Sequence, residues 1–304
     1  MQGPDFMSLT SFLNNKNVKE KFKQELPKPG FSVKRELLAP PLTNHYTLMG
    51  TAFDYLMRFY LKYLNPRAIT RKWVAEESLE SFLRLRGVPC FNVDSEKLDL
   101  EESLSSLSKN DKALFKRIQK ITQQAKVKYA EFLNSGKITN ELMKSALLLA
   151  QLDPIVRAGV VDVNIGIIDD KNIKDLKNLI FFVNPKTFKA NKICLLNPTF
   201  GKASKLVRGA DVDLVIDDMM IDIKTTKKFE LQRTYFNQLI GYYMLSKIGG
   251  LDGMPPRQGI KRLGLYFSRY AYLYVINVRD IINENTFSNF VEWFRKRANK
   301  EYGI

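Results

Sequence analysis

The residues best suited to chemistry lie between Gly209 and Thr226, in the stretch GADVDLVIDDMMIDIKTT. Apolar and acidic residues alternate on both sides of Asp217-Asp218, which is typical of a β-hairpin with a two-residue turn. Outward from that turn, the predicted register pairs Ile216 with Met219, Val215 with Met220, Leu214 with Ile221, Asp213 with Asp222, Val212 with Ile223 and Asp211 with Lys224. The hairpin therefore sets Asp213 directly opposite Asp222.

Alternation along the strands divides these residues between two faces. The apolar face would hold Val212, Leu214, Ile216, Met219, Ile221 and Ile223, and the polar face Asp211, Asp213, Asp222 and Lys224. Directly opposed Cβ atoms lie roughly 4.5 to 5.5 Å apart, so two carboxylates there are destabilising unless a cation lies between them. Hard oxygen donors without nearby His or Cys favour Mg²⁺ or Mn²⁺ over zinc. If the turn is one step longer, Asp211 takes the place of Asp213.

A divalent ion beside a lysine is equipped for phosphodiester hydrolysis, because the metal activates water and stabilises charge on the phosphate oxygens. Lys224, two residues past Asp222, would orient the attacking water. The alternative interpretation is an ordinary hairpin with solvated surface charges and a Lys-Asp pair.

The helix expected at Glu230 to Ile248 carries a second polar pair. Its core stripe would be Phe236, Leu239, Ile240, Tyr243, Met244 and Ile248. Gln238 and Tyr242, one turn apart, then lie on a neighbouring face that the core does not need. The alternative is an ordinary glutamine beside a half-buried tyrosine.

Together these residues resemble the PD-(D/E)XK nuclease superfamily and, within it, the RecB-like branch. Asp213 matches the single motif aspartate, Asp222-Ile223-Lys224 followed by Thr225 matches the (D/E)-x-K element, and Gln238 to Tyr242 matches the Q-x-x-x-Y signature. The resemblance implies an α/β, restriction-endonuclease-like fold with a mixed central sheet flanked by helices. It also implies a metal-dependent deoxyribonuclease, exonuclease or endonuclease, in which Gln238 and Tyr242 lie beside the metal and help to hold DNA.

The family's upstream Gly-Thr-x-x-His motif is matched by Gly50 to Asp54, with Asp54 in place of the histidine. A carboxylate there could be a third metal ligand. Equally, Thr51 as N-cap with Asp54 three residues on resembles a capping box, and Asp54 could pair with Arg58. Other suppliers of a third acidic ligand are Glu76, Glu77 and Glu80.

The chain has 304 residues, with 48 Lys and Arg against 32 Asp and Glu, a net charge of +16. Such a surplus implies a polyanionic partner, either nucleic acid or an anionic membrane surface. Cations flank the motif at Lys205, Arg208, Lys227, Lys228 and Arg233, where a phosphate backbone would pass; each alone could be a solvated charge. The motifs favour DNA as the partner, and two other functions stay open: a non-catalytic nucleic-acid-binding or scaffold protein, and a nuclease acting on RNA.

Several other chemistries lack their residues. Cys90 and Cys194 are too few for an iron-sulfur cluster, and Gly136-Lys137 lacks the other residues of a phosphate loop, so no nucleotide cofactor is expected. With His45 as the single histidine, a serine-histidine triad has little support. No apolar run approaches the roughly 18 residues that span a bilayer, so a cytoplasmic protein without membrane contact is expected. Unwinding of DNA would need a helicase or other protein partner, and the oligomeric state is left open.

The pattern along the chain predicts three parts: an irregular arm at 1–46 with one short helix, a nuclease core at 47–96 and 161–304, and a helical insertion at 97–160. Helices are expected from Thr51 to just before Pro66, from about Thr70 to Leu85, at Glu230 to Ile248 and at about Asn283 to Glu301. Besides the hairpin, strands are expected at Val160–Ile168, Leu179–Val183, Ile193–Leu196, Leu263–Tyr270 and Tyr272–Val278.

Overall fold

The computed structural model describes residues 8–88 and 104–303. The chain divides into two compact units. The first comprises Met1–Pro40, Leu64–Arg71 and Phe182–Ile304, and the second comprises Pro41–Tyr63 and Lys72–Phe181. Residues 47–63, 72–88 and 161–181, assigned from the sequence to the nuclease core, thus fall in the second unit.

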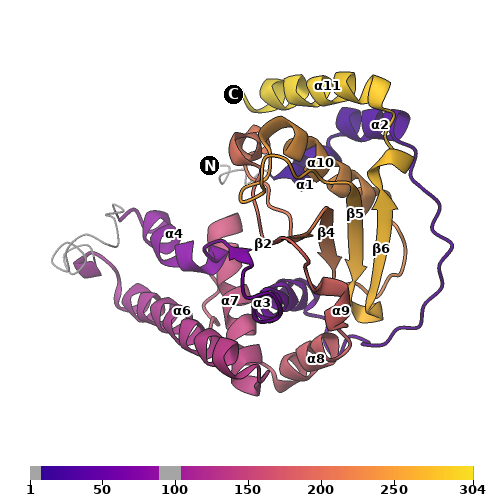
Figure 1. Cartoon of the computed structure of the whole chain (residues 1–304). Coiled ribbons are helices and arrows are strands. Elements are labelled where there is room, and N and C mark those ends of the chain that lie inside the picture. The colour runs from indigo at the N-terminus through magenta and orange to yellow at the C-terminus, as the bar shows by residue number, and fades with distance from the viewer. Residues whose placement is uncertain (1–7, 89–103, 304) are drawn as a thin grey trace. The chain divides into compact units, whose positions relative to one another are not determined.

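The first unit is built on a mixed sheet of six strands among the described residues (Figure 1). The strands are β1 (Ile69–Thr70), β2 (Cys194–Leu196), β3 (Leu214–Ile216), β4 (Met219–Lys224), β5 (Arg262–Phe267) and β6 (Tyr272–Asn277), and they are adjacent in that order. The pairs β1/β2 and β4/β5 are parallel, and the other neighbours are antiparallel. The α/β class predicted from the sequence is confirmed.

The hairpin register is confirmed where β3 and β4 pair, with Ile216 opposite Met219 and Leu214 opposite Ile221. Asp217 adopts a φ of 55° in the turn, a conformation that aspartate tolerates better than most residues. Beyond Leu214 the predicted ladder does not continue. Asp213 lies in a bend, and Asp211 forms an antiparallel bridge with Thr199 instead of pairing with Lys224.

The bend also changes the face of Val212. It belongs to the buried cluster of Val215 and Met220, which α10 (Arg233–Gly249) covers, and not to the face of Leu214 on which strict alternation places it. Both faces of the hairpin are buried, since Met219, Met220 and Ile221 are each at most 5% exposed. The polar residues of the motif are therefore confined to the ends of the strands.

The N-terminal arm contains two helices where one short helix was predicted. They are α1 (Leu9–Asn14) and α2 (Lys16–Glu25). Each contributes a phenylalanine to the core: the ring of Phe12 lies 5.2 Å from that of Phe294, and Phe22 lies 5.0 Å from Phe290. Both partners belong to the closing helix α11 (Glu284–Tyr302), which is close to its predicted bounds. The proline-rich stretch after α2 is irregular, as expected.

The second unit is helical. Its main elements are α3 (Tyr46–Leu64), the 3₁₀ turn η1 (Val74–Glu77), α4 (Ser78–Leu85), α6 (Lys109–Ser135), α7 (Asn140–Ala158) and α8 (Asp170–Phe181). Helices α6 and α7 confirm the helical region predicted there, joined by a turn in which Gly136 has a φ of 67°. The helix predicted from Thr70 is wrong in its first half, because Thr70 is in β1 and the α-helix begins only at Ser78.

Two predicted strands are absent. Residues 160–168 form turns and loops, in which Ile165 is buried but Val163 and Ile167 are 75% and 69% exposed. Leu179 and Ile180 lie in the last turn of α8, where they share a buried face with Leu176. The three- to four-residue spacing of these side chains favours a helix, and it outweighs the nearby β-branched residues that suggested a strand. The short elements that follow are α9 (Pro185–Phe188) and η2 (Gly201–Val207).

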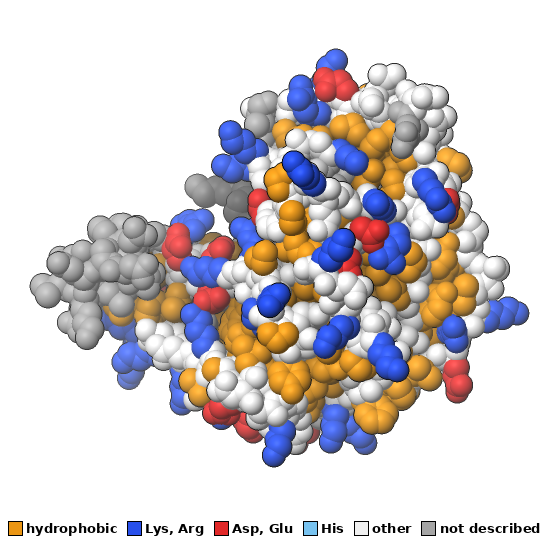
Figure 2. All heavy atoms as spheres, in the orientation of Figure 1, with side chains coloured by type: hydrophobic (Ala, Val, Ile, Leu, Met, Phe, Trp, Pro, Cys, Tyr) orange, Lys and Arg blue, Asp and Glu red, His pale blue; other side chains and the backbone are white. Residues whose placement is uncertain are grey.

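Basic residues outnumber acidic ones in the chain, 48 to 32. Figure 2 shows more Lys and Arg than Asp and Glu side chains on the face in view. No helix in the described ranges combines the length and apolar character that crossing a membrane requires.

Candidate active site

Asp222 and Lys224 stand at the end of β4. The carboxylate Oδ2 of Asp222 lies 2.7 Å from the ammonium Nζ of Lys224, and their side chains are 3% and 18% exposed. Residues two apart on a strand share a face, and Met220 on this face is packed in the cluster that α10 covers. A buried ion pair thus lies between the sheet and α10.

Asp213 is tied to the same place by its side chain. Its Oδ2 accepts a hydrogen bond of 2.5 Å from the backbone amide of Ile223, the residue between Asp222 and Lys224. Its backbone carbonyl accepts from the amide of Asn197 at 2.9 Å. The predicted convergence of Asp213 with the Asp-x-Lys strand is therefore present, although it is achieved through a bend and not through a continued ladder.

Gln238 and Tyr242 of α10 extend this group. Lys224 Nζ donates to Gln238 Oε1 at 2.8 Å, and Gln238 Nε2 donates to the hydroxyl of Tyr242, also at 2.8 Å. One continuous chain of contacts thus runs from Asp222 through Lys224 and Gln238 to Tyr242. Motifs predicted separately on a strand and on a helix meet in space.

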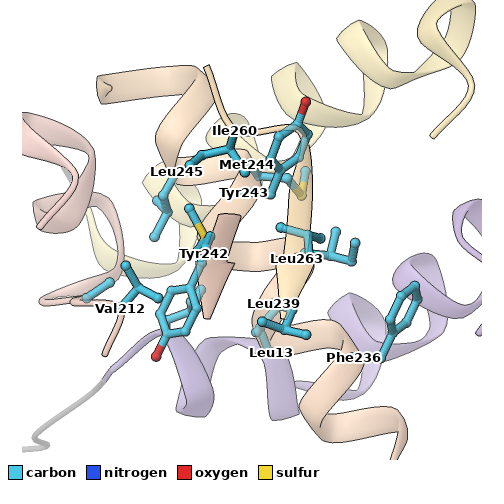
Figure 3. Packing of buried hydrophobic residues seen from close by; sticks show 14 of the residues in the cluster. Leu13, Val212, Phe236, Leu239, Tyr242, Tyr243, Met244, Leu245, Ile260 and Leu263 are labelled. Carbon is cyan, nitrogen blue, oxygen red and sulfur yellow. The ribbon is translucent and has the colours of Figure 1, made fainter. Parts of the chain in front are cut away.

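Tyr242 is more deeply buried than its predicted place beside the core stripe. It is 7% exposed, and its ring stacks on Phe200 with centroids 5.7 Å apart. Figure 3 shows it among the packed side chains, near Val212. The helix is covered on a further side by α1, which packs so closely that a Cβ on Gly241 would meet Leu13 and Leu9 at 3.1 Å. The core does need Tyr242.

Two further side chains at the site were missed by sequence reasoning. Asn197, 9% exposed with a φ of 50°, donates from Nδ2 to Asp211 Oδ2 at 3.1 Å. Tyr235 places its ring centroid 5.0 Å from Lys224 Nζ, a cation–π distance. The available signals were weak: an Asn-Pro dipeptide after a strand, and an aromatic residue one turn before Gln238.

The carboxylates and the ammonium shift one another's pKa. Burial raises the pKa of Asp222, and the adjacent Lys224 lowers it by less. Burial lowers the pKa of Lys224, but the charges of Asp222 and Asp213 raise it by more, so the net shift is upward. Lys224 is therefore a cation at neutral pH, because a raised pKa makes the loss of its proton less favourable.

The pKa of the Tyr242 hydroxyl is also shifted by the acidic groups of the site. Burial raises the pKa of its hydroxyl, and the negative charges of Asp222, Asp213 and Asp211 raise it further. Tyr242 is thus a neutral hydrogen-bonding group and not a phenolate.

Carboxylate oxygens are the ligands that a hard divalent cation prefers. Asp213 and Asp222 offer carboxylate oxygens, and the charge of Asp211 also raises the pKa of the Tyr242 hydroxyl. Over the ranges 8–88 and 104–303, no group of three or more His, Cys, Asp or Glu side chains is close enough to hold a metal by itself. An ion such as Mg²⁺, which keeps several waters and binds through one or two carboxylates, does not require a third.

The remaining acidic candidates all belong to the helical unit. Asp54 is ion-paired with Arg58 at 2.7 Å, the interaction foreseen as its alternative role. Because α3 begins at Tyr46, Thr51 lies inside the helix and is no N-cap. Glu76 pairs with Lys126 at 2.6 Å, and Glu80 with Arg84 at 3.2 Å. Asp54, Glu76 and Glu80 thus each have a structural partner, and Glu77 is exposed. The ring of His45 likewise contacts Asn172 at 3.3 Å.

The flanking cations differ in availability. Lys205, Arg208, Lys227 and Lys228 are exposed, and the guanidinium of Arg208 lies 5.3 Å from the ring centroid of Tyr302. Arg233 is engaged elsewhere, since it donates to the carbonyl oxygens of Leu26 and Phe22 at the end of α2. Arg233 thus anchors the N-terminal arm, and it is not available to a phosphate in this arrangement. Cys194 is buried in β2, and Cys90 lies outside the described residues.

No family model matches the chain, and no curated protein and no solved structure matches it either. The interpretation of the site therefore depends on its own geometry.

Proposed function

We propose that this protein is a metal-dependent deoxyribonuclease that hydrolyses DNA phosphodiester bonds on a restriction-endonuclease-like fold of the PD-(D/E)XK superfamily. The observation that carries the proposal is the chain of contacts from Asp222 through Lys224 and Gln238 to Tyr242, with Asp213 hydrogen-bonded to Ile223. An accidental set of surface charges would not be buried, because each buried charge costs free energy unless it is paired.

Asp213 and Asp222 would hold Mg²⁺ or Mn²⁺. When bound there, such an ion supplies charge stabilisation to the phosphate oxygens and lowers the pKa of a water molecule. Lys224, a cation at this site, would orient the attacking water and donate to a phosphate oxygen. Gln238 fixes the Lys224 ammonium, and the buried hydroxyl of Tyr242 fixes Gln238 in turn. Tyr242 is therefore a positioning residue in this proposal.

The arrangement of the elements supports the fold assignment. An antiparallel hairpin delivers Asp213 and Asp222, and α10 then crosses over to β5, which lies parallel to β4. The crossover places the Gln238 face of the helix over the polar end of β4. The basic surface supports DNA as the substrate, with Lys205, Arg208, Lys227 and Lys228 as phosphate contacts.

The test is DNA cleavage by the whole chain with Mn²⁺ or Mg²⁺. Wild type should degrade DNA, and Lys224→Ala should lose at least a hundredfold in rate, as expected when a preorganised donor is removed. Lys116→Ala, the same change at an exposed position of α6, is the matched control and should cleave normally. Linear and circular DNA together separate an exonuclease from an endonuclease.

The same assay decides between the alternatives. Cleavage of RNA alone would replace the substrate class. Absence of cleavage with either metal, combined with a shift of DNA in a gel, would instead favour a binding or scaffold protein.

A further inference from the structure

A basic groove lies at the opposite end of β4 from the candidate active site. It consists of two adjoining cavities of about 830 and 520 Å³ that share Asp218 and Lys261 in their walls. One cavity extends over α10 and α11, and the other extends along the segment before β2 and the loop before β5. The six cations that line it are Lys192, Lys247, Arg257, Lys261, Arg262 and Arg279.

The groove is separated from the catalytic group by the length of the strand. In the parallel pair of β4 and β5, Met219 pairs with Arg262 at the groove end, and Lys224 pairs with Phe267 at the other end. Five residues at about 3.3 Å each give a separation of about 16 Å. The groove is therefore distinct from the group around Lys224.

Most of its positive charge faces solvent. Lys192, Lys247, Arg257 and Lys261 are exposed, and the side chain of Arg279 is 86% exposed. Arg279 lies 3.6 Å from Asp280, an exposed pair of the kind that contributes little and is easily displaced. These side chains can turn towards a ligand at small cost.

The two acidic residues in the walls are already engaged. Asp217 accepts hydrogen bonds from the backbone amides of Asn191, Lys192 and Ile193 at 2.7 to 3.1 Å. Asp218 accepts from Nε and Nη2 of Arg262 at 2.8 and 2.5 Å. Neither carboxylate is directed at an incoming anion, so the groove presents a clear excess of positive charge.

Two adjoining cavities with this charge suit a polyanion better than a single small anion. One phosphate needs two or three donors, whereas the cations here are spread over two joined cavities. The phosphodiester backbone is the polyanion whose repeating charges match such spacing. Backbone contacts of this kind position a nucleic acid without reading its sequence.

We propose that the basic groove is a second DNA-binding site, which holds the phosphate backbone at a distance from the cleavage centre. The proposal deepens the function proposed above and rests on DNA being the substrate. A duplex rises about 3.4 Å per base pair, so a segment that touches both places spans at least about five base pairs.

The test measures binding apart from cleavage. A 20-base-pair duplex is titrated with the whole chain in EDTA by fluorescence anisotropy at several salt concentrations. The groove variant combines Lys247→Ala, Lys261→Ala and Arg279→Ala. The control combines Lys23→Ala, Lys296→Ala and Lys300→Ala, which removes the same charge from exposed positions outside the groove.

Loss of three phosphate contacts should weaken binding about tenfold near 0.1 M salt. It should also reduce the slope of log K against log salt by about 2.7, at 0.9 for each contact in duplex DNA. The control should stay within about twofold of wild type. Melting curves of both variants show whether each is folded.

If the folded groove variant and the control bind DNA with equal affinity and equal salt dependence, the proposal of a second DNA-binding site is wrong. Absence of DNA binding by wild type would also refute it. Cleavage with Mn²⁺ is scored separately. If binding depends on the groove but no DNA is cleaved, the second DNA-binding site is supported and the nuclease proposal is refuted. If DNA is cleaved but binding does not depend on the groove, the nuclease proposal is supported and the second DNA-binding site is refuted.

Discussion

The two ends of β4 organise charge in opposite ways. At the end that carries Lys224, an acid and a base are buried against each other, and the side chain of Asp222 is 3% exposed. At the turn, six and seven residues before Lys224, the acids are bonded to amides and to Arg262, while several cations extend into solvent. Burial fixes charge in one geometry, and exposure leaves it mobile.

This difference matches the size of the proposed ligands. A small hard ion and a reacting phosphate need donors held within a few tenths of an ångström, which packing and hydrogen bonds provide. A long polyanion needs only a field and adaptable side chains. In these proposals, one strand carries the catalytic site at one end and the DNA-binding groove at the other.

The largest effect is expected from Asp222→Asn, which keeps the shape of the side chain and removes its charge. DNA cleavage should fall about a thousandfold or more, because both the metal and Lys224 lose their buried partner. Asp218→Asn, the same change at the turn end of the strand, should leave the cleavage rate at saturating DNA within about twofold, because the groove that Asp218 lines acts on DNA binding. Equal losses for the two variants would erase the distinction between the two ends.

Gln238→Ala should lower the cleavage rate about ten- to a hundredfold, because the Lys224 ammonium loses the acceptor at 2.8 Å that fixes its position. The loss should fall on kcat, with KM little changed, since the residue orients a catalytic group. Gln232→Ala at the start of the same helix is the control. A rise in KM alone would mean that Gln238 contacts DNA directly.

At the turn end, Asp217→Asn should cost about 1–2 kcal/mol of stability at neutral pH. Burial raises the pKa of Asp217, but the amides of Asn191, Lys192 and Ile193 lower it by more, so the net pKa is below its usual value. The stabilisation is therefore present above pH 4 and disappears as the pH falls through the lowered pKa. Urea titrations between pH 2 and 7 should show the two proteins converging in acid, and a constant difference would refute the contribution of the charge.

The smallest effect is expected from Tyr242→Phe. The ring still stacks on Phe200, but Gln238 loses the hydroxyl that accepts its amide hydrogen. Stability should fall by about 1 kcal/mol, and cleavage by less than tenfold. A loss of cleavage as large as that of Asp222→Asn would show that the hydroxyl takes part in the reaction itself.

Local patterns in the sequence predicted the hairpin and α10 because both elements are determined by residues that are close together in the sequence. Alternation about Asp217-Asp218 sets the register of β3 and β4, and the spacing of Phe236, Leu239 and Tyr243 sets the buried side of the helix. The meeting of Gln238 with Lys224 is a tertiary contact, and the resemblance to a family was what indicated it.

Features set by distant contacts could not be predicted in this way. Helix α1 buries a further side of α10 at Gly241, and Tyr242 is buried because its ring stacks on Phe200, far away in the sequence. Likewise, the β-branched residues at 160–168 suggested a strand, but Val163 and Ile167 have no sheet to cover and remain exposed. A strand needs a neighbour as well as a propensity.

Mn²⁺ binding by the whole chain tests the central claim most directly, with the free ion followed by its electron paramagnetic resonance signal at neutral pH. Wild type is predicted to remove one Mn²⁺ per chain from solution, and Asp213→Asn and Asp222→Asn are each predicted to leave most of that ion free. Asp218→Asn should bind as wild type does. Identical titrations for all four proteins would contradict the assignment of Asp213 and Asp222 as the metal ligands.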